Sequence, residues 1–317
     1  MEQKQSAVGV GKTRMKLCDM NDSINSKYIN RFCWPLLTEW VFALVFYFGA
    51  IAMSITGSIS LVVGSVTVCL SYFALFNSMH AAAHRHFSGG LKKYRWIDES
   101  IGRITGVLTQ VPYRPFAKIH IAHHKNTGVF GADPDFVPFP SFRLMNKYYF
   151  LSYLLQVGSI IPIFNKFMMK RLPKFIRQRL EFRKDKIINR QLAITLLIVL
   201  TTFAAGYGSY GLWLFYFPFL LQRYMLMVGF MWLPHVSGFS GRYVNTRSLI
   251  TPIINRISFM KLIDFHAEHH LYPSVPSSYL RKLHFEIIDE LDENKVVYVG
   301  RFNKKPWKPS RAGTVAH

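Results

Sequence analysis

Two long runs of the sequence are apolar and almost without charge. From Trp40 to His84 the chain has no Asp, Glu, Lys or Arg, and between Gln191 and Gly241 the only charged residue is Arg223. The hydrocarbon core of a bilayer takes roughly 20 helical residues, so each run is long enough for two membrane-crossing helices. The pattern therefore predicts an integral membrane protein.

Short turn-forming segments divide each run into two predicted spans. One is Gly57-Ser58, and the other is the Gly-, Tyr- and Ser-rich segment 207–211. The four predicted spans cover residues 40–56, 59–79, 191–206 and 212–233. We therefore expect an all-α fold in which two transmembrane hairpins support a cytoplasmic helical cap.

The charge balance is strongly basic and uneven along the chain. The 317 residues include 39 Lys and Arg against 17 Asp and Glu, a formal net charge of +22, and every basic residue except Arg223 lies outside the predicted spans. Cytoplasmic segments of membrane proteins carry such an excess, so both termini and the central segment are expected on the cytoplasmic side. Contact with an anionic leaflet accounts for the charge better than nucleic-acid binding does.

Flanking segments are expected on either side of a membrane domain over residues 40–284. Residues 1–39 form a polar segment without the order of a cleaved signal, so we expect it to be retained. Residues 285–317 are expected to form a loose basic tail. Cys18, Cys33 and Cys69 have no metal-binding or disulfide spacing and are typical of a reducing compartment.

Histidines carry the chemistry that the sequence indicates. Most of the 12 histidines fall into short windows. Three sets have helical spacing: His80 with His84, His120 with His123 and His124, and His266 with His269 and His270. Positions i, i+3 and i+4 of a helix share one face, so each set is expected to present converging imidazoles. Three such sets on one side of the membrane predict a metal site.

The number of imidazoles indicates two ions. A structural zinc takes four ligands and a catalytic zinc takes three and a water molecule, so these sets exceed the need of one ion. Imidazole suits Zn, Cu, Fe and Ni alike, and the residues by themselves leave the metal open.

The apolar stretch 148–165 bears on whether the sets can meet. It is 18 residues long and contains Gln156, Gly158 and Pro162. A crossing here would place the third histidine set on the opposite face of the membrane from the first two. We therefore interpret the stretch as an interfacial helix.

Three motifs resemble a known family. HAAAH at 80–84, HIAHH at 120–124 and HAEHH at 266–270 resemble the histidine boxes of the membrane fatty acid desaturase superfamily, which also includes hydroxylases, alkane monooxygenases and carotenoid ketolases. The resemblance covers about residues 40–284. It implies a di-iron centre that uses O2 and two electrons from an external donor. The implied ligands are His80, His84, His120, His123, His124, His266, His269 and His270, with His235 as the further ligand that many relatives carry ahead of the third box.

The sequence does not decide which reaction of this superfamily the protein catalyses. HAEHHLYPSVP, followed by Leu283-His284, is similar to bacterial acyl-lipid desaturases and hydrocarbon hydroxylases. HHKNTGVFGADPDF and Leu233-Pro234-His235 are similar to carotenoid ketolases. We favour a desaturase acting on a long-chain lipid, with a hydroxylase or ketolase as the alternative. A metal transporter or a zinc hydrolase is a remote alternative, because a transporter needs polar ligands at the depth of the bilayer.

Further residues near the boxes are candidates for supporting roles. Carboxylates often accept the outer N–H of a ligating imidazole, and those close to the sets are Asp133, Asp135, Asp264 and Glu268. His86 is expected to be solvated or to support a ligand. Arg223 is expected to face the helix bundle or an interface, because a charge in lipid is costly.

Electrons must come from a separate protein. The sequence has no haem motif, no cysteine set for an iron–sulfur cluster and no dinucleotide-binding fingerprint. We expect a ferredoxin- or cytochrome-type donor, for which basic segments such as 166–186 are candidate docking surfaces.

Overall fold

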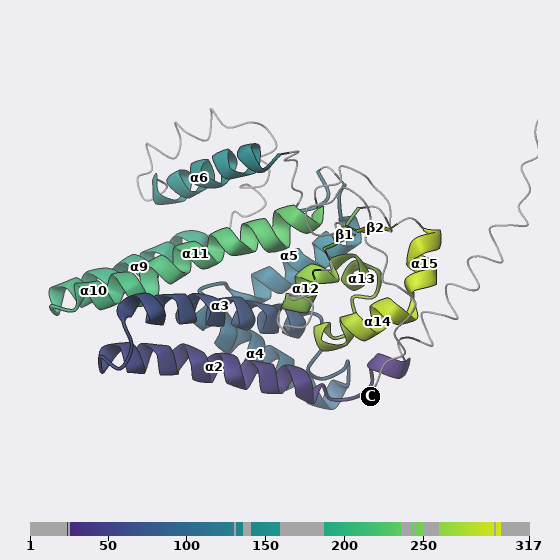
Figure 1. Cartoon of the computed structure of the whole chain (residues 1–317), viewed down its shortest axis with the longest axis horizontal. Coiled ribbons are helices and arrows are strands. Elements are labelled where there is room, and N and C mark those ends of the chain that lie inside the picture. The colour runs from purple at the N-terminus through teal and green to yellow at the C-terminus, as the bar shows by residue number, and fades with distance from the viewer. Residues whose placement is uncertain are drawn as a thin grey trace, which may run out of the picture.

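The described part of the chain is almost entirely helical. This computed structural model describes residues 24, 26–129, 131–135, 141–158, 187–235, 243, 245–249, 251, 260–294 and 296–298. Long helices lie side by side and extend to one end of the molecule, and short helices gather at the other end (Figure 1).

The first predicted hairpin is formed by α2, Trp34–Ile55, and α3, Leu61–Ala83, which pack against each other. Gly57 has a φ of 74°, a conformation that glycine adopts without a steric cost, and it makes the tight turn. Ser60 caps α3 by accepting a hydrogen bond from the Val63 N–H at 3.3 Å. Helix α2 begins before the predicted span 40–56, and α3 ends after the predicted span 59–79, so that it continues through His80.

The second hairpin differs in detail from the expectation. Its first helix is α9, Ile187–Ala204, and the turn contains Gly206 with a φ of 81°. The segment 207–211 was expected to form this turn, but α10, Gly208–Gly211, is already helical. The Tyr207 carbonyl oxygen accepts backbone hydrogen bonds from Tyr210 and Gly211, so Gly208 and Gly211 belong to the first helical turn.

The second helix of this hairpin runs without a break to His235. After α10 it consists of a π-helical segment, η2, Leu212–Tyr216, then α11, Phe217–Leu226, a second π-helical segment, η3, Met227–Trp232, and a 3₁₀ turn, η4, Leu233–His235. A π turn holds more residues than an α turn and often occurs near functional sites. These turns therefore set the direction in which the end of the helix presents His235.

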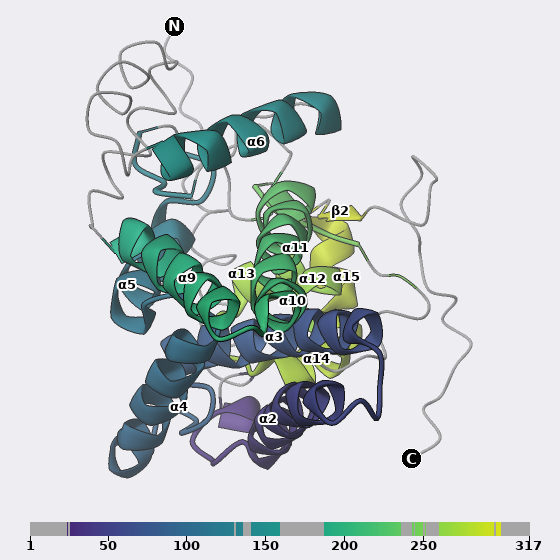
Figure 2. The same cartoon turned by 90° about the vertical axis from the view of Figure 1, so that its left-hand side faces the viewer.

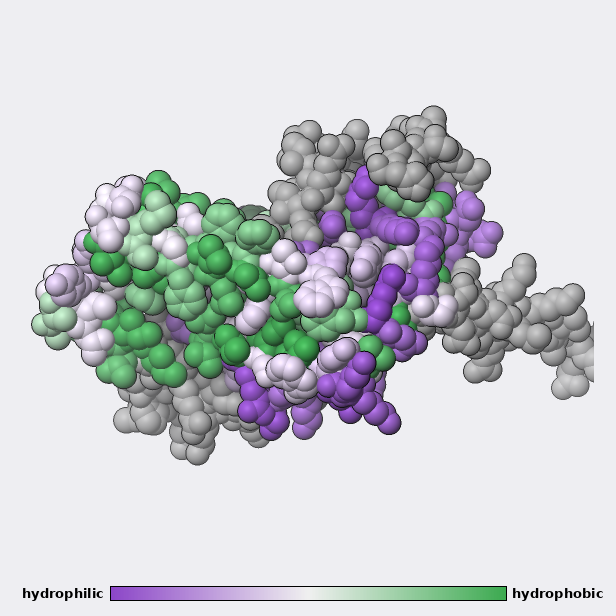
Figure 3. Space-filling view, turned by 90° about the horizontal axis from the view of Figure 1, so that it is seen from below, coloured by the Kyte–Doolittle hydropathy of each residue, from purple (hydrophilic) through white to green (hydrophobic). Residues whose placement is uncertain are grey.

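Among the described residues, three helices are long and apolar enough to cross a membrane: Trp34–Ile55, Leu61–Ala83 and Gly208–His235. Apolar side chains such as Phe42, Phe46 and Val62 are more than half exposed on them. Figure 3 shows an apolar surface over this part of the molecule, and hydrophilic residues at the other end. A fourth span over 191–206 stays a prediction, although α9 forms a helix there.

Helix α6, Phe142–Gly158, lies across the second hairpin (Figure 2). Met145 is buried there against Met227 and Trp232, and the Tyr224 hydroxyl donates a hydrogen bond to Asn146 Oδ1 at 2.8 Å. This helix overlaps the interfacial helix predicted for 148–165, of which residues 159–165 lie outside the described residues. Its place in the membrane interface stays a prediction.

The other end of the bundle is a cap of short elements. They are η1, Lys92–Tyr94; α4, Arg95–Leu108; α5, Tyr113–Asn126; β1, Arg247–Ser248; α12, Lys261–Asp264; α13, His266–Leu271; η7, Ser277–Tyr279; α14, Leu280–Glu286; α15, Ile288–Glu293; and β2, Val297–Tyr298. The strands β1 and β2 pair in parallel. The Tyr28 and Tyr279 rings lie 5.6 Å apart, so the N-terminal part of the described chain packs beside α14. The region predicted as a tail thus begins inside ordered helices.

Candidate metal centre

Four helical segments deliver the clustered histidines to one place. Helix α3 ends there with His80 and, at its C-cap, His84, while the end of the Gly208–His235 helix supplies His235. Helix α5 supplies His120, His123 and His124, and α13 supplies His266, His269 and His270. All the histidines predicted as ligands therefore lie at the same end of the bundle.

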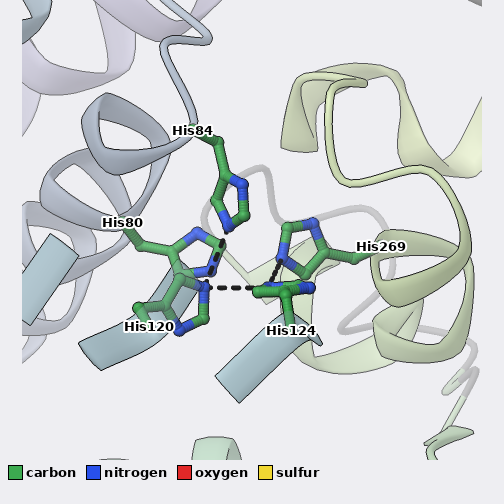
Figure 4. Close-up of side chains that lie close together, drawn as sticks. All are labelled: His80, His84, His120, His124 and His269. Atoms are coloured by element: carbon green, nitrogen blue, oxygen red, sulfur yellow. Dashed lines mark hydrogen bonds between the residues drawn. The ribbon is translucent and has the colours of Figure 1, made fainter. Parts of the chain in front are cut away.

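The first cluster contains five imidazoles, those of His80, His84, His120, His124 and His269. Their candidate ligand atoms all lie within 4.8 Å of one another. Figure 4 shows the five rings turned toward a common centre from α3, α5 and α13. The Nε2 atom of His120 is 2.9 Å from those of both His84 and His124, and the Nε2 atoms of His124 and His269 are 3.1 Å apart.

The second cluster contains the remaining four imidazoles. His235 Nε2 lies 3.1 Å from His123 Nε2, 3.1 Å from His266 Nε2 and 3.4 Å from His270 Nε2. His266 and His270 complete the group, with their Nε2 atoms 3.1 Å apart. The two clusters adjoin, since the rings of His124 and His270 stack with centroids 4.1 Å apart.

The predicted sets do not converge as intact sets. His120 and His124 belong to the first cluster, whereas His123 belongs to the second. Consecutive residues of an α-helix point about 100° apart, so neighbouring His123 and His124 cannot face one centre. The same rotation separates His269 from His270 on α13. Each HxxHH motif therefore contributes to both clusters, which corrects the expectation of one convergent group per motif.

Backbone carbonyls fix the tautomers of two imidazoles in the second cluster. His235 Nδ1 lies 3.0 Å from the Met231 carbonyl oxygen, and His266 Nδ1 lies 3.2 Å from that of Leu262. A carbonyl oxygen only accepts hydrogen bonds, so both Nδ1 atoms carry the proton. In a neutral ring, Nε2 then presents a lone pair.

Side chains fix the other two tautomers. The Asp133 carboxylate accepts a hydrogen bond from His123 Nδ1 at 2.7 Å. The Thr127 hydroxyl donates its proton to the His123 carbonyl oxygen at 2.7 Å. Its oxygen therefore accepts from His270 Nδ1, 3.2 Å away. In this cluster all four Nδ1 atoms, the outer nitrogens, are thus hydrogen-bond donors. All four Nε2 atoms carry a lone pair and no proton.

Such an arrangement is suited to binding a cation. Burial and the neighbouring imidazoles lower the pKa of His270 well below its usual value, and burial lowers the pKa of His266 to about 3. Protonation of these two rings near neutral pH therefore does not supply a positive charge. Four converging lone pairs without a proton between them repel one another, whereas a metal ion at their centre turns the repulsion into coordination.

Spacing in the first cluster also fits a metal ion. With a metal–nitrogen bond of about 2.1 Å, ligands at right angles have nitrogens about 3.0 Å apart, and tetrahedral ligands about 3.4 Å apart. The Nε2–Nε2 distances of 2.9 to 3.1 Å match the right-angle arrangement. Burial lowers the pKa of His120 and His269, so these rings are neutral and able to coordinate. A five-nitrogen set exceeds what a tetrahedral zinc takes.

The outer nitrogens distinguish the two clusters. In the first, the Nδ1 atoms of His80, His124 and His269 are buried without a hydrogen-bond partner, and so is His80 Nε2. In the second, every Nδ1 has an acceptor. Outer hydrogen bonds orient ligating imidazoles and raise their basicity, so the second cluster is the more firmly oriented of the two.

The four candidate carboxylates have different surroundings. Asp133 bonds His123 as predicted, and it also accepts the Gly128 and Asp135 N–H groups at 2.9 and 2.8 Å. Asp264 accepts hydrogen bonds from Thr251, and burial raises its pKa to about 6. Asp135 is buried next to Asp133.

Glu268 bonds a histidine outside the clusters. Its side chain is fully buried between the ligating positions of α13, and it accepts a hydrogen bond from His284 Nδ1 at 2.5 Å. The Ser248 hydroxyl donates to the other carboxylate oxygen, and Ser248 accepts the Ala267 N–H at 3.0 Å. Glu268 thereby connects α13 to α14 and β1.

His86 and Arg223 have surroundings that sequence reasoning left open. His86 is not solvated: it is 1% exposed, its ring stacks on His84 at 5.3 Å, and its Nε2 donates to the Pro273 carbonyl at 2.8 Å. Burial lowers its pKa to about 4. The Arg223 guanidinium lies over the ring of Phe219, one turn earlier on the same helix, at 4.5 Å, and its orientation toward the bundle or an interface stays a prediction.

Two residues of the site were missed by sequence reasoning. Thr127 follows the second motif, and its contact with His270 spans 143 positions of sequence. Arg247 Nε donates to the Leu233 carbonyl oxygen at 2.5 Å, at the end of the helix that presents His235. No local pattern indicates either contact, because both join segments that are distant in the sequence.

A known protein family matches most of the chain. A family model described as fatty acid desaturase matches residues 56–302, which include every histidine of both clusters. No curated protein matches the chain.

Proposed function

Because the chain belongs to the fatty acid desaturase family, we propose that it is a membrane oxidoreductase that uses O2 and a di-iron centre to introduce a C=C bond into a long-chain acyl lipid. The family membership supports a lipid-modifying oxidoreductase in a membrane. The observation that carries the finer proposal is the pair of adjoining histidine clusters, each able to hold one ion.

In this proposal each cluster holds one iron. The first ion is bound by His80, His84, His120, His124 and His269, and the second by His123, His235, His266 and His270. Bound iron supplies the activation of O2 that an unreactive C–H bond requires. The protein contributes neutral nitrogen ligands, a fixed orientation for each ring and burial that limits access of water to the centre.

An apolar approach to the clusters supports a hydrocarbon substrate. Phe76 precedes His80 by one helical turn, and its ring contacts those of Phe116 and Phe230 edge to face at 5.3 and 5.2 Å. Phe230 also contacts His80, with centroids 5.4 Å apart. These aromatic rings lie on the side of the clusters toward the apolar helices, where an alkyl chain leaving the bilayer would arrive.

Desaturation and hydroxylation share the first step and differ in the second. Removal of two hydrogens from neighbouring carbons, with O2, two electrons and two protons, gives an alkene and two water molecules. Replacement of one C–H bond by C–OH consumes the same reagents and gives one water molecule. We favour desaturation because the family model that matches the chain is described as fatty acid desaturase, and we keep a hydroxylase or ketolase as the second candidate.

The proposed orientation places both termini and the centre on the cytoplasmic side. All clustered histidines lie at one end of the candidate spans. The N-terminal Lys27 pairs with Glu286 of α14 at that same end, at 2.5 Å. The excess of basic residues outside the spans favours the cytoplasmic face. A separate ferredoxin- or cytochrome-type protein would deliver electrons there.

Expression in a host of known lipid composition tests this function. We expect a fatty acid lighter by two mass units, and about two irons per purified chain. A product heavier by sixteen units selects the hydroxylase, and a single zinc refutes the di-iron proposal. His269→Ala should abolish the product and release iron. His86→Asn is the matched control, because His86 is equally buried beside the centre but belongs to neither cluster.

A further inference from the structure

Asn77 is a buried amide without a protein partner. It lies on α3 and is 1% exposed, and neither Nδ2 nor Oδ1 makes a hydrogen bond. Buried polar groups in proteins nearly always have a partner, and an unpaired one costs free energy. A residue that keeps two such atoms unpaired therefore needs an explanation.

Its position on α3 connects it to the first cluster. Asn77, His80 and His84 occupy positions i, i+3 and i+7, which fall on one stripe of a helix. Because α3 runs from the apolar end of the bundle into the cap, Asn77 is one turn nearer the membrane than His80. His80 is fully buried too, and neither of its nitrogens makes a hydrogen bond. The stripe thus begins with an unpaired amide and continues with two candidate ligands.

Aromatic side chains lie at the same level of the bundle. Phe76, the residue before Asn77, lies in the aromatic contact with Phe116 and Phe230, and Phe73 one turn earlier is buried. An alkyl substrate reaching the clusters from the membrane passes this level. The carboxamide is therefore a polar group on an apolar approach, next to the place where oxygen chemistry is proposed.

We propose that the Asn77 carboxamide binds an O–H group inside the reaction chamber, as a polar residue of the centre. An O–H group both donates and accepts hydrogen bonds, and so does a carboxamide. This inference rests on the proposed function. The O–H group belongs either to a water molecule at the centre or to an oxygenated substrate or product, and the experiment separates these sources.

Asn77→Leu is the decisive variant, with Gln222→Met as its matched control. Leucine has the same branched shape as asparagine and cannot form hydrogen bonds. Gln222 is also 1% exposed and has an unpaired Nε2, but it precedes His235 by 13 residues, about 20 Å along the helix. Thermal unfolding, iron content, the optical spectrum without substrate, and product amounts are measured on the full-length protein.

We expect both variants to fold and to keep two irons, because neither Asn77 nor Gln222 is a candidate metal ligand. Only Asn77→Leu should lose activity, by about tenfold, the equivalent of one hydrogen bond. A changed spectrum without substrate assigns the O–H group to water. An unchanged spectrum with a raised KM or an altered alkene-to-alcohol ratio assigns it to substrate or product.

Wild-type turnover and product ratio in Asn77→Leu overturn the inference. If that variant fails to fold, Asn77→Ala is measured in the same way, and full activity there overturns the inference as well. A wild-type protein that binds no iron or makes no product refutes the proposed function instead. The two failures are therefore distinguishable.

Discussion

Replacement of Asp133 by Asn tests whether the second cluster holds a metal ion. Asp133 Oδ1 accepts hydrogen bonds from His123 Nδ1 and the Asp135 N–H, and Oδ2 accepts the Gly128 N–H. An asparagine can keep the two bonds to Oδ1, but its Nδ2 then faces the Gly128 N–H, and the charge beside His123 is lost. The change therefore weakens the support of one imidazole without removing a ligand.

The expected magnitude follows from these contacts. Mutation of an outer partner of a ligating histidine typically lowers metal affinity by about 10- to 100-fold, equivalent to about 1.4 to 2.7 kcal/mol. The unpaired Gly128 N–H costs a further 1 to 3 kcal/mol or so in the free energy of unfolding. Dialysis against graded concentrations of chelator, followed by metal analysis, should show one of the two irons leaving Asp133→Asn at a lower chelator concentration than it leaves the wild type.

Asp98→Asn supplies the control for general damage to a buried carboxylate. Asp98 is 3% exposed and accepts the Phe87 and Ser88 N–H groups at 3.1 and 3.3 Å, and in the described contacts it bonds none of the clustered histidines. Asp98→Asn should lose about as much stability as Asp133→Asn. It should release iron at the same chelator concentration as the wild type. Equal retention of both irons by Asp133→Asn and the wild type would refute the assignment of His123 as an oriented ligand.

Two further predictions concern Thr127 and Asp98. Thr127→Val removes the acceptor of His270 Nδ1 and should weaken binding of one iron by about 10-fold or more, while Thr127→Ser should retain both irons in metal analysis. Equal iron loss in both variants would contradict the role of the hydroxyl. Burial raises the pKa of Asp98 to about 6, above its usual 3.8. The folded state therefore binds this proton more strongly, and stability should fall by roughly 2 kcal/mol as the pH rises from about 4 to 6. Asp98→Asn should lack this component in unfolding measured across that range, and parallel profiles of the two proteins would exclude it.

The residue pattern was sufficient for the main features of the fold. Absence of charge over 45 residues predicted the hairpin of α2 and α3, and glycine at position 57 marked its turn. The helix leading to His235 was also predicted, but its bounds were wrong, because the glycines at 208 and 211 pack within a helix instead of ending one. A glycine permits a turn, and only packing decides whether the turn forms.

The site was predictable as a list of residues and not as two groups. Helical spacing identifies His120, His123 and His124 as a set, but the assignment of each ring to a cluster depends on how α5 and α13 are rotated against each other. The contacts that fix ring orientation come from Thr127 and from the Leu262 and Met231 carbonyls. Such contacts depend on tertiary structure, which local periodicity does not encode.

If each cluster holds an ion as proposed, the division of α5 and α13 between the two clusters predicts cooperative loading of metal. An ion in either cluster would immobilise both helices, since each helix gives histidines to both clusters. The second ion would then meet rings that have already lost much of their conformational freedom, and it would bind at a smaller entropic cost. Titration of the apoprotein with Fe²⁺ should accordingly populate few singly loaded chains, and the midpoint of loading should be sharper than that of two independent sites.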